Sequence, residues 1–123
     1  MSRPTSESYL HYHSFDQDTK TLSRFNGWGV TLYDSLDTMY LMGLQDEFQR
    51  ALHVIEKATF PLKEGTFAPF FETVIRYLGG LLSAYALSRE RILLTKADEL
   101  ARLLSPVFTT PSGLPCFEVN TVK

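Results

Sequence analysis

The sequence predicts an all-α fold built from helical hairpins. Apolar residues recur at intervals of three and four in four successive segments, which is the spacing of one helical face. Short connections join these segments in pairs, and no segment alternates between apolar and polar residues as a half-buried strand does. With 123 residues and 44% hydrophobic side chains, the chain has a globular composition and the length of one domain at most.

The first hairpin is expected after an irregular, polar lead-in that covers residues 1–24. The apolar positions of its first helix are Trp28, Leu32, Leu36, Met39 and Tyr40. Gly43 is suited to end this helix in a left-handed cap. The apolar stripe of the second helix consists of Phe48, Ala51, Leu52 and Ile55. Asp46 is a candidate N-cap for the second helix, and Pro61 lies beyond its end.

The second hairpin is expected between residues 70 and 104. Its first helix is the stretch "FFETVIRYLGGLLSAYALS", residues 70–88, and its second helix runs from about Arg89 to Leu104. The inward positions of this second helix are Ile92, Leu93, Ala97, Leu100, Ala101 and Leu104. Pro106 stops the helix, and the Pro and Gly residues of "TTPSGLPCFEVN" then predict a loop.

The 70–88 helix has two different faces. One arc of the helix holds Phe71, Val74, Ile75, Leu78, Leu81, Leu82 and Tyr85. The other arc holds Glu72, Arg76, Gly79, Gly80 and Ser83. Each glycine inside a helix costs about 1 kcal/mol relative to alanine. We therefore expect another helix or a ligand to approach the backbone closely at the glycine pair.

Glu72 and Arg76 are the ionised residues of this apolar helix, and they lie one turn apart. One interpretation is an i, i+4 ion pair with a structural role, in which the arginine neutralises the glutamate. The other is a carboxyl group that lines a pocket and is held by the guanidinium. Periodicity alone leaves both interpretations open.

Charge and motif composition exclude several other functions. Twelve basic against 14 acidic residues give no basic field, so nucleic acid is not an expected partner. No segment is apolar over the roughly 18 residues of a membrane span, and no signal peptide is visible. His11 and His13 lack a third metal ligand at a suitable spacing, and His53 is expected at the surface. Cys116 is interpreted as an inert thiol or as the partner of a cysteine outside this chain.

Three sequence blocks, in this order, resemble class I α-mannosidases, glycoside hydrolase family 47. The blocks are "GWGVTLYDSLDTMYLMGLQDEF", "FFETVIRYLGGLLSAYALS" and "TPSGLP" with "VNTV" after it. The resemblance implies an (α/α)7 barrel, with residues 25–123 as a partial, incomplete catalytic domain that supplies about the first two of seven hairpins. It also implies calcium-dependent, inverting removal of α-1,2-linked mannose from high-mannose N-glycans.

The resemblance assigns roles to the acid and arginine pair. Glu72 matches a catalytic acid of the family, and Arg76 matches an active-site residue that positions the acid and contacts sugar. Asp34 and Asp37 lie too close together on one helix to flank a glycosidic bond, so we interpret them as structural residues that bond neighbouring groups within the helical layer. The remaining catalytic carboxylates and the calcium ligands are expected outside these 123 residues.

The resemblance also leads to expectations about the chain as a whole. The chain is expected to be a fragment with no measurable hydrolysis alone and with exposed apolar faces that promote aggregation. The secretory pathway, meaning endoplasmic reticulum or Golgi, or secretion is implied as its location. Two alternatives remain open: a helical scaffold that binds a protein through the Glu72 and Arg76 face, and a non-catalytic mannosidase-like protein that binds glycans.

Overall fold

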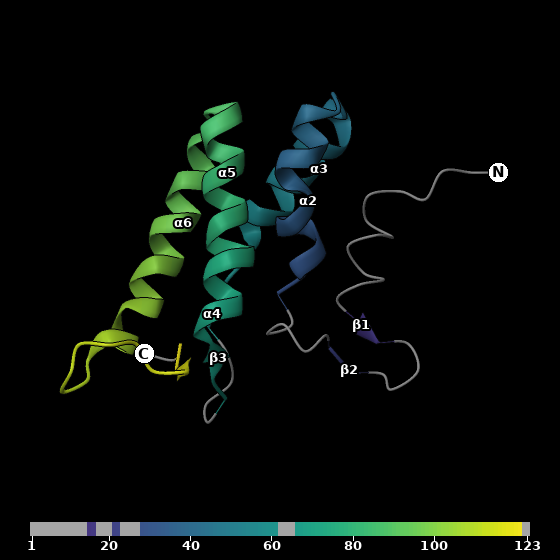
Figure 1. The fold of residues 1–123 in the computed structure, drawn as a ribbon. Coiled ribbons are helices and arrows are strands. Elements are labelled where there is room, and N and C mark those ends of the chain that lie inside the picture. The colour runs from purple at the N-terminus through teal and green to yellow at the C-terminus, as the bar shows by residue number, and fades with distance from the viewer. Residues whose placement is uncertain (1–14, 17–20, 23–27, 62–65, 122–123) are drawn as a thin grey trace.

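A computed structural model describes residues 15–16, 21–22, 28–61 and 66–121 of the chain (Figure 1). In chain order the elements are β1 (Phe15–Asp16), β2 (Thr21–Leu22), α2 (Val30–Leu41), α3 (Gln45–Lys57), β3 (Ala68–Pro69), α4 (Phe70–Glu72), a π-helical segment (Thr73–Leu78), α5 (Gly79–Ser88), α6 (Arg91–Leu104), a 3-10 turn (Ser105–Phe108) and β4 (Glu118–Val119). Among these residues no helix has the length and apolar character that a membrane crossing would require. The four helices expected from periodicity are confirmed, with boundaries within a few residues.

Helix α4, the π-helical segment and α5 are continuous, and together they form what we call the central helix, residues 70–88. Its first turn follows Pro69, whose carbonyl accepts a 2.6 Å hydrogen bond from Thr73 Oγ1. A π-helical segment adds a residue to the turn and therefore shifts the faces on its two sides relative to each other. Such segments occur frequently at functional sites, and this one begins directly after Glu72.

The helices form two antiparallel hairpins that stack side by side (Figure 1). Gly43 (φ 73°) lies in the turn between α2 and α3, as expected, and Arg89 (φ 61°) lies in the turn between α5 and α6. Helix α2 and the central helix run in the same direction and pack on each other, while α3 packs on α6. The first helices of the two hairpins thus make one layer, and the second helices make another.

The core lies between these layers, and the two amphipathic helices contribute to it much as predicted. All four apolar residues expected on α3 are buried, and so are Leu93, Ala97, Leu100 and Leu104 on α6. Ala101 was expected to face inward, but it is exposed. Tyr33 on α2 is 1% exposed and was not among the predicted apolar positions; its ring contacts that of Tyr77 edge to face, with centroids 4.9 Å apart.

The apolar arc of the central helix is covered only in part. Phe71, Ile75 and Leu82 are 66%, 50% and 43% exposed. Leu81 of the same arc is buried, and Val74, Leu78 and Tyr85 are partly buried against the core. Thr73, Tyr77 and Ala84, which lie outside the arc, are buried as well. The helix contacts α2 and α6 through a face with several small residues, and it is apolar on nearly every side. Its apolar periodicity therefore does not by itself indicate which part of the surface is covered.

Short strand pairs were not expected from the sequence, and they correct that analysis. β3 and β4 pair antiparallel, with Ala68 opposite Val119 and Pro69 opposite Glu118. β1 and β2 form a second pair within the expected lead-in. Each strand has only two residues, which is too short for an alternating pattern to be read. The β3 and β4 pair fixes the backbone directly before the central helix.

Candidate functional site

Glu72 and Arg76 form an ion pair on the central helix. The Arg76 Nε–H donates a hydrogen bond of 2.7 Å to Glu72 Oε2. The two side chains are 34% and 37% exposed, so no neighbouring helix seals them off from solvent. This accessibility is compatible with a site, whereas a fully enclosed pair would have favoured a purely structural role.

Asp34, on α2, binds the same guanidinium. Arg76 Nη1–H donates to Asp34 Oδ2 at 3.1 Å, and the Asp34 side chain is 40% exposed. One arginine therefore links two carboxylates that come from two different helices. The sequence analysis did not predict that Asp34 contacts this pair. Asp34 and Arg76 are 42 residues apart, and no local sequence pattern indicates their contact.

The hydrogen bonds to Glu72 and Asp34 raise the pKa of Arg76 above its ordinary value. The guanidinium therefore remains a cation throughout the working pH range of a protein. A permanent positive charge between two carboxyl groups keeps them from repelling each other across the gap between the helices.

Asp37 lies one turn further along α2, and its contacts are separate from Arg76. Its Oδ2 accepts a 2.8 Å hydrogen bond from Ser83 Oγ on α5, and its Oδ1 accepts one of 2.8 Å from the Thr38 backbone N–H. The contacts of Asp34 and Asp37 are thus with neighbouring groups in the helical layer, as the sequence analysis expected. The group that Asp34 contacts is Arg76 of the candidate catalytic pair.

The glycine pair serves helix packing at Gly80. A methyl group added to Gly80 would overlap the Tyr33 carbonyl oxygen and lie 3.0 Å from its carbonyl carbon, so α2 approaches the central helix there at backbone distance. A methyl group on Gly79 would meet the Val74 carbonyl oxygen at an ordinary 3.4 Å. Of the two approaches that the sequence left open at these glycines, helix contact is the one observed at Gly80.

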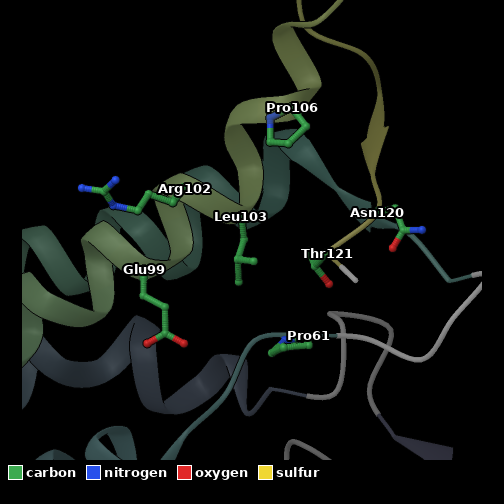
Figure 2. A pocket seen from close by; sticks show the side chains of 7 residues that line it. All are labelled: Pro61, Glu99, Arg102, Leu103, Pro106, Asn120 and Thr121. Atoms are coloured by element: carbon green, nitrogen blue, oxygen red, sulfur yellow. The ribbon is translucent and has the colours of Figure 1, made fainter. Parts of the chain in front are cut away.

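A cavity of about 480 Å³ lies away from this pair, between α6, the following turn and the chain beyond β4 (Figure 2). Its lining residues are Pro61, Glu99, Arg102, Leu103, Pro106, Asn120 and Thr121. Neither Glu72 nor Arg76 belongs to this lining. The candidate acid therefore lies on an accessible surface and not in this cavity.

The sequence analysis also considered histidine and cysteine residues as candidates for a functional role. His53 is exposed on α3, 4.0 Å from Glu56, as expected. Cys116 is an exposed, free cysteine. His11 and His13 lie outside the described residues. Within the described parts of the chain, no three His, Cys, Asp or Glu side chains gather where they could hold a metal ion.

Two stacked hairpins with parallel first helices define an all-α class of fold, and the layer formed by the first helices carries the acid and arginine pair. The chain belongs to glycosyl hydrolase family 47, which matches residues 3–123.

Two curated relatives illustrate the similarity in sequence. The chain is 43% identical over 102 residues to the endoplasmic reticulum mannosyl-oligosaccharide 1,2-alpha-mannosidase of Mus musculus, and the match covers 83% of this chain. It is 47% identical over 117 residues to the mannosyl-oligosaccharide 1,2-alpha-mannosidase IC of Homo sapiens, and that match covers 89% of this chain. These matches take in only 15% and 18% of the relatives' own lengths.

A solved structure illustrates the similarity in fold. The alpha-1,2-mannosidase from Trichoderma reesei superposes with a TM-score of 0.82 at 34% sequence identity. The superposition covers 94% of this chain and 27% of that enzyme. The enzyme is an (α/α)7 barrel, so the expected fold class is confirmed: the two hairpins correspond to part of such a barrel.

Proposed function

We propose that this chain carries the acid half of an α-1,2-mannosidase site, with Glu72 as the catalytic acid and Arg76 as the residue that positions it and contacts sugar. The observation that carries the proposal is the 2.7 Å bond from Arg76 Nε to Glu72 Oε2, on an accessible face of a helix in a family of glycosyl hydrolases. Because Oε2 accepts the arginine N–H, Oε1 is the oxygen from which a proton would be delivered.

The proposed reaction is inverting hydrolysis. Glu72 gives its proton to the glycosidic oxygen as the bond to the anomeric carbon breaks, while water attacks that carbon from the opposite face. A second carboxylate must take a proton from this water, at a separation of about 6.5–9.5 Å from the acid. We assign no described residue to this second role.

Calcium dependence remains a prediction from the family resemblance. The described residues contain no cluster of metal ligands, so they do not fit a calcium site, and no step of the proposed mechanism passes through the ion. The test is removal of calcium with a chelator from an active form that contains this segment; loss of mannose release that calcium alone restores is the expected result.

The proposed substrate is the α-1,2-mannose of high-mannose N-glycans, and the proposed location is the secretory pathway. Both rest on the names of relatives, one of which is called an endoplasmic reticulum mannosyl-oligosaccharide 1,2-alpha-mannosidase. The 123-residue chain by itself is expected to release no measurable mannose from α-1,2-mannobiose, because only the acid is assigned. Release that Glu72→Gln abolishes would contradict this expectation.

The catalytic assignment can be tested by segment exchange. Residues 28–121 would replace the matching segment of the Trichoderma reesei enzyme, and the hybrid is expected to hydrolyse α-1,2-mannobiose. Glu72→Gln in the hybrid should lower kcat by about 10²- to 10⁴-fold, the usual contribution of a general acid. Glu56→Gln, at a 63% exposed side chain on α3, is the matched control and should leave kcat unchanged. An active hybrid that tolerates Glu72→Gln would refute the assignment.

A second candidate, a protein-interaction scaffold, is favoured by one observation. Phe71 and Ile75 are largely exposed next to Glu72 and Arg76 on the same helix, and exposed apolar patches commonly mark interaction surfaces. If this surface binds protein, Phe71→Lys and Ile75→Lys should abolish self-association or partner binding in sedimentation experiments. Binding of mannobiose by calorimetry that Glu72→Gln leaves unchanged would instead favour a glycan-binding protein without acid chemistry.

A further inference from the structure

We infer that Asp34 is a positioning residue, which holds the guanidinium of Arg76 in the orientation that serves Glu72. This inference rests on the proposed function for its catalytic meaning. The observation behind it is the 3.1 Å contact between Arg76 Nη1 and Asp34 Oδ2, made by the same guanidinium that contacts Glu72 at 2.7 Å.

The i, i+4 contact with Glu72 does not by itself fix the Arg76 side chain. Arginine is long and flexible, and an ion pair between partly exposed side chains loses much of its energy to water and to side-chain entropy. A guanidinium is planar, so two anchors at two different nitrogens, Nε and Nη1, define the direction of its plane. The Asp34 contact supplies the second anchor.

Asp34 can act as an anchor because its own backbone is fixed relative to the central helix. The preceding residue, Tyr33, is 1% exposed, and its carbonyl group lies against Gly80. One turn later, Asp37 accepts a hydrogen bond from Ser83 on α5. The Asp34 carboxylate therefore projects from a rigidly packed position, whereas Glu72 moves with the same helix as Arg76.

A substitution of Asp37 serves as a control for a substitution of Asp34, which both weakens the contact between the helices and removes an anchor of Arg76. Both aspartates lie on α2, and both accept a hydrogen bond from the central helix, but only the Asp34 bond comes from Arg76. Asp37→Asn weakens the tie between the helices without altering the charge next to the guanidinium. Asp34→Asn weakens a tie of the same kind and also removes the second anchor of Arg76.

The experiment uses the 123-residue chain labelled with ¹⁵N, in which the Arg76 Nε–H signal reports the Glu72 contact directly. We expect Asp34→Asn to speed hydrogen exchange of this proton by about threefold, the scale of a partly exposed ion pair. Asp37→Asn should leave the exchange rate unchanged, and Asp34→Glu should restore most of the protection. Circular dichroism melting checks that all three variants fold.

The outcomes decide the inference whether or not the proposed function holds. An Arg76 signal that Asp34→Asn leaves unchanged, or that Asp37→Asn disturbs equally, overturns the positioning role. In the active hybrid enzyme, Asp34→Asn should lower kcat more than it raises KM, and Asp34→Glu should recover activity. If Glu72→Gln has no effect on the hybrid, the proposed function fails, while the Arg76 signal still decides whether Asp34 positions the arginine.

Discussion

Gly80 of α5 lies directly against the carbonyl group of Tyr33 in α2, so the two parallel helices meet there backbone to backbone. This contact sets the distance between the helices that carry Asp34 and Arg76. Neither helix can shift outward at this point without separating the arginine from one of its two carboxylates.

Gly80→Ala should therefore destabilise the fold. The added methyl group would overlap the Tyr33 carbonyl oxygen, which belongs to a helix backbone and cannot rotate away. We expect a loss of about 1–3 kcal/mol in the free energy of unfolding, typical of overpacking, measured by urea denaturation. Gly79→Ala is the matched control: its methyl group meets only an ordinary contact, and the higher helix propensity of alanine should add up to about 1 kcal/mol of stability. Equal effects of the two substitutions would contradict this interpretation.

Leu81 and Leu82 test which face of the central helix is covered. Leu81 is fully buried, whereas Leu82 is 43% exposed. Leu81→Ala should cost about 2–5 kcal/mol in the free energy of unfolding, as for other leucines in cores. Leu82→Ala should cost less than about 1 kcal/mol, because much of its side chain is already in contact with water. Chemical denaturation of both variants gives the comparison, and a larger loss at Leu82 would reverse the assignment of the two faces.

The buried hydroxyl of Tyr33 predicts a stabilising substitution. Within the described part of the chain this hydroxyl has no hydrogen-bond partner, although it is removed from water. Tyr33→Phe keeps the ring contacts and removes an unpaired polar group, so we expect stability to rise by about 1 kcal/mol in a thermal melt. Tyr77→Phe, where the hydroxyl is hydrogen-bonded to the Trp28 backbone, should instead lower stability. A loss at Tyr33 comparable to that at Tyr77 would indicate an internal partner, such as a buried water molecule.

The same two tyrosines predict alkaline sensitivity. Burial raises the pKa of Tyr33 and Tyr77 above the ordinary tyrosine value of about 10. Below about pH 10 the tyrosines are neutral in both the folded and the unfolded state, so their contribution to stability is fully present. Above that pH the unfolded chain releases protons that the folded chain retains, so each tyrosine can cost up to about 1.4 kcal/mol of stability per pH unit. Urea midpoints at rising pH should fall more steeply for the unmodified chain than for the Tyr33→Phe variant.

The success of the sequence analysis followed the strength of the amphipathic pattern. Helices α3 and α6 have a clear apolar stripe, and the stripe on α3 is buried as predicted. The central helix is apolar almost all round, so the choice of its covered face depended on the small residue Gly80 and on the π-helical segment, neither of which shapes a hydrophobic pattern.

The same distinction applies to the candidate site. Glu72 and Arg76 lie one turn apart, so their contact could be predicted from helical spacing alone. Asp34 reaches Arg76 only because two hairpins stack with their first helices in parallel, and that depends on contacts between residues far apart in the sequence. The contact between Glu72 and Arg76 can therefore be predicted from local sequence, whereas the contact between Asp34 and Arg76 depends on tertiary packing.

The short ladder between β3 and β4 has a consequence for the order of folding. The Phe70 N–H donates to the carbonyl of Phe117, the residue directly before β4, at 2.9 Å, so the chain that follows the second hairpin holds the first turn of the helix that bears Glu72. Closing so long a loop costs entropy before any contact compensates for it, which delays such pairings. During translation, the backbone contacts that hold the helix turn bearing Glu72 can form only after residue 119 has been synthesised.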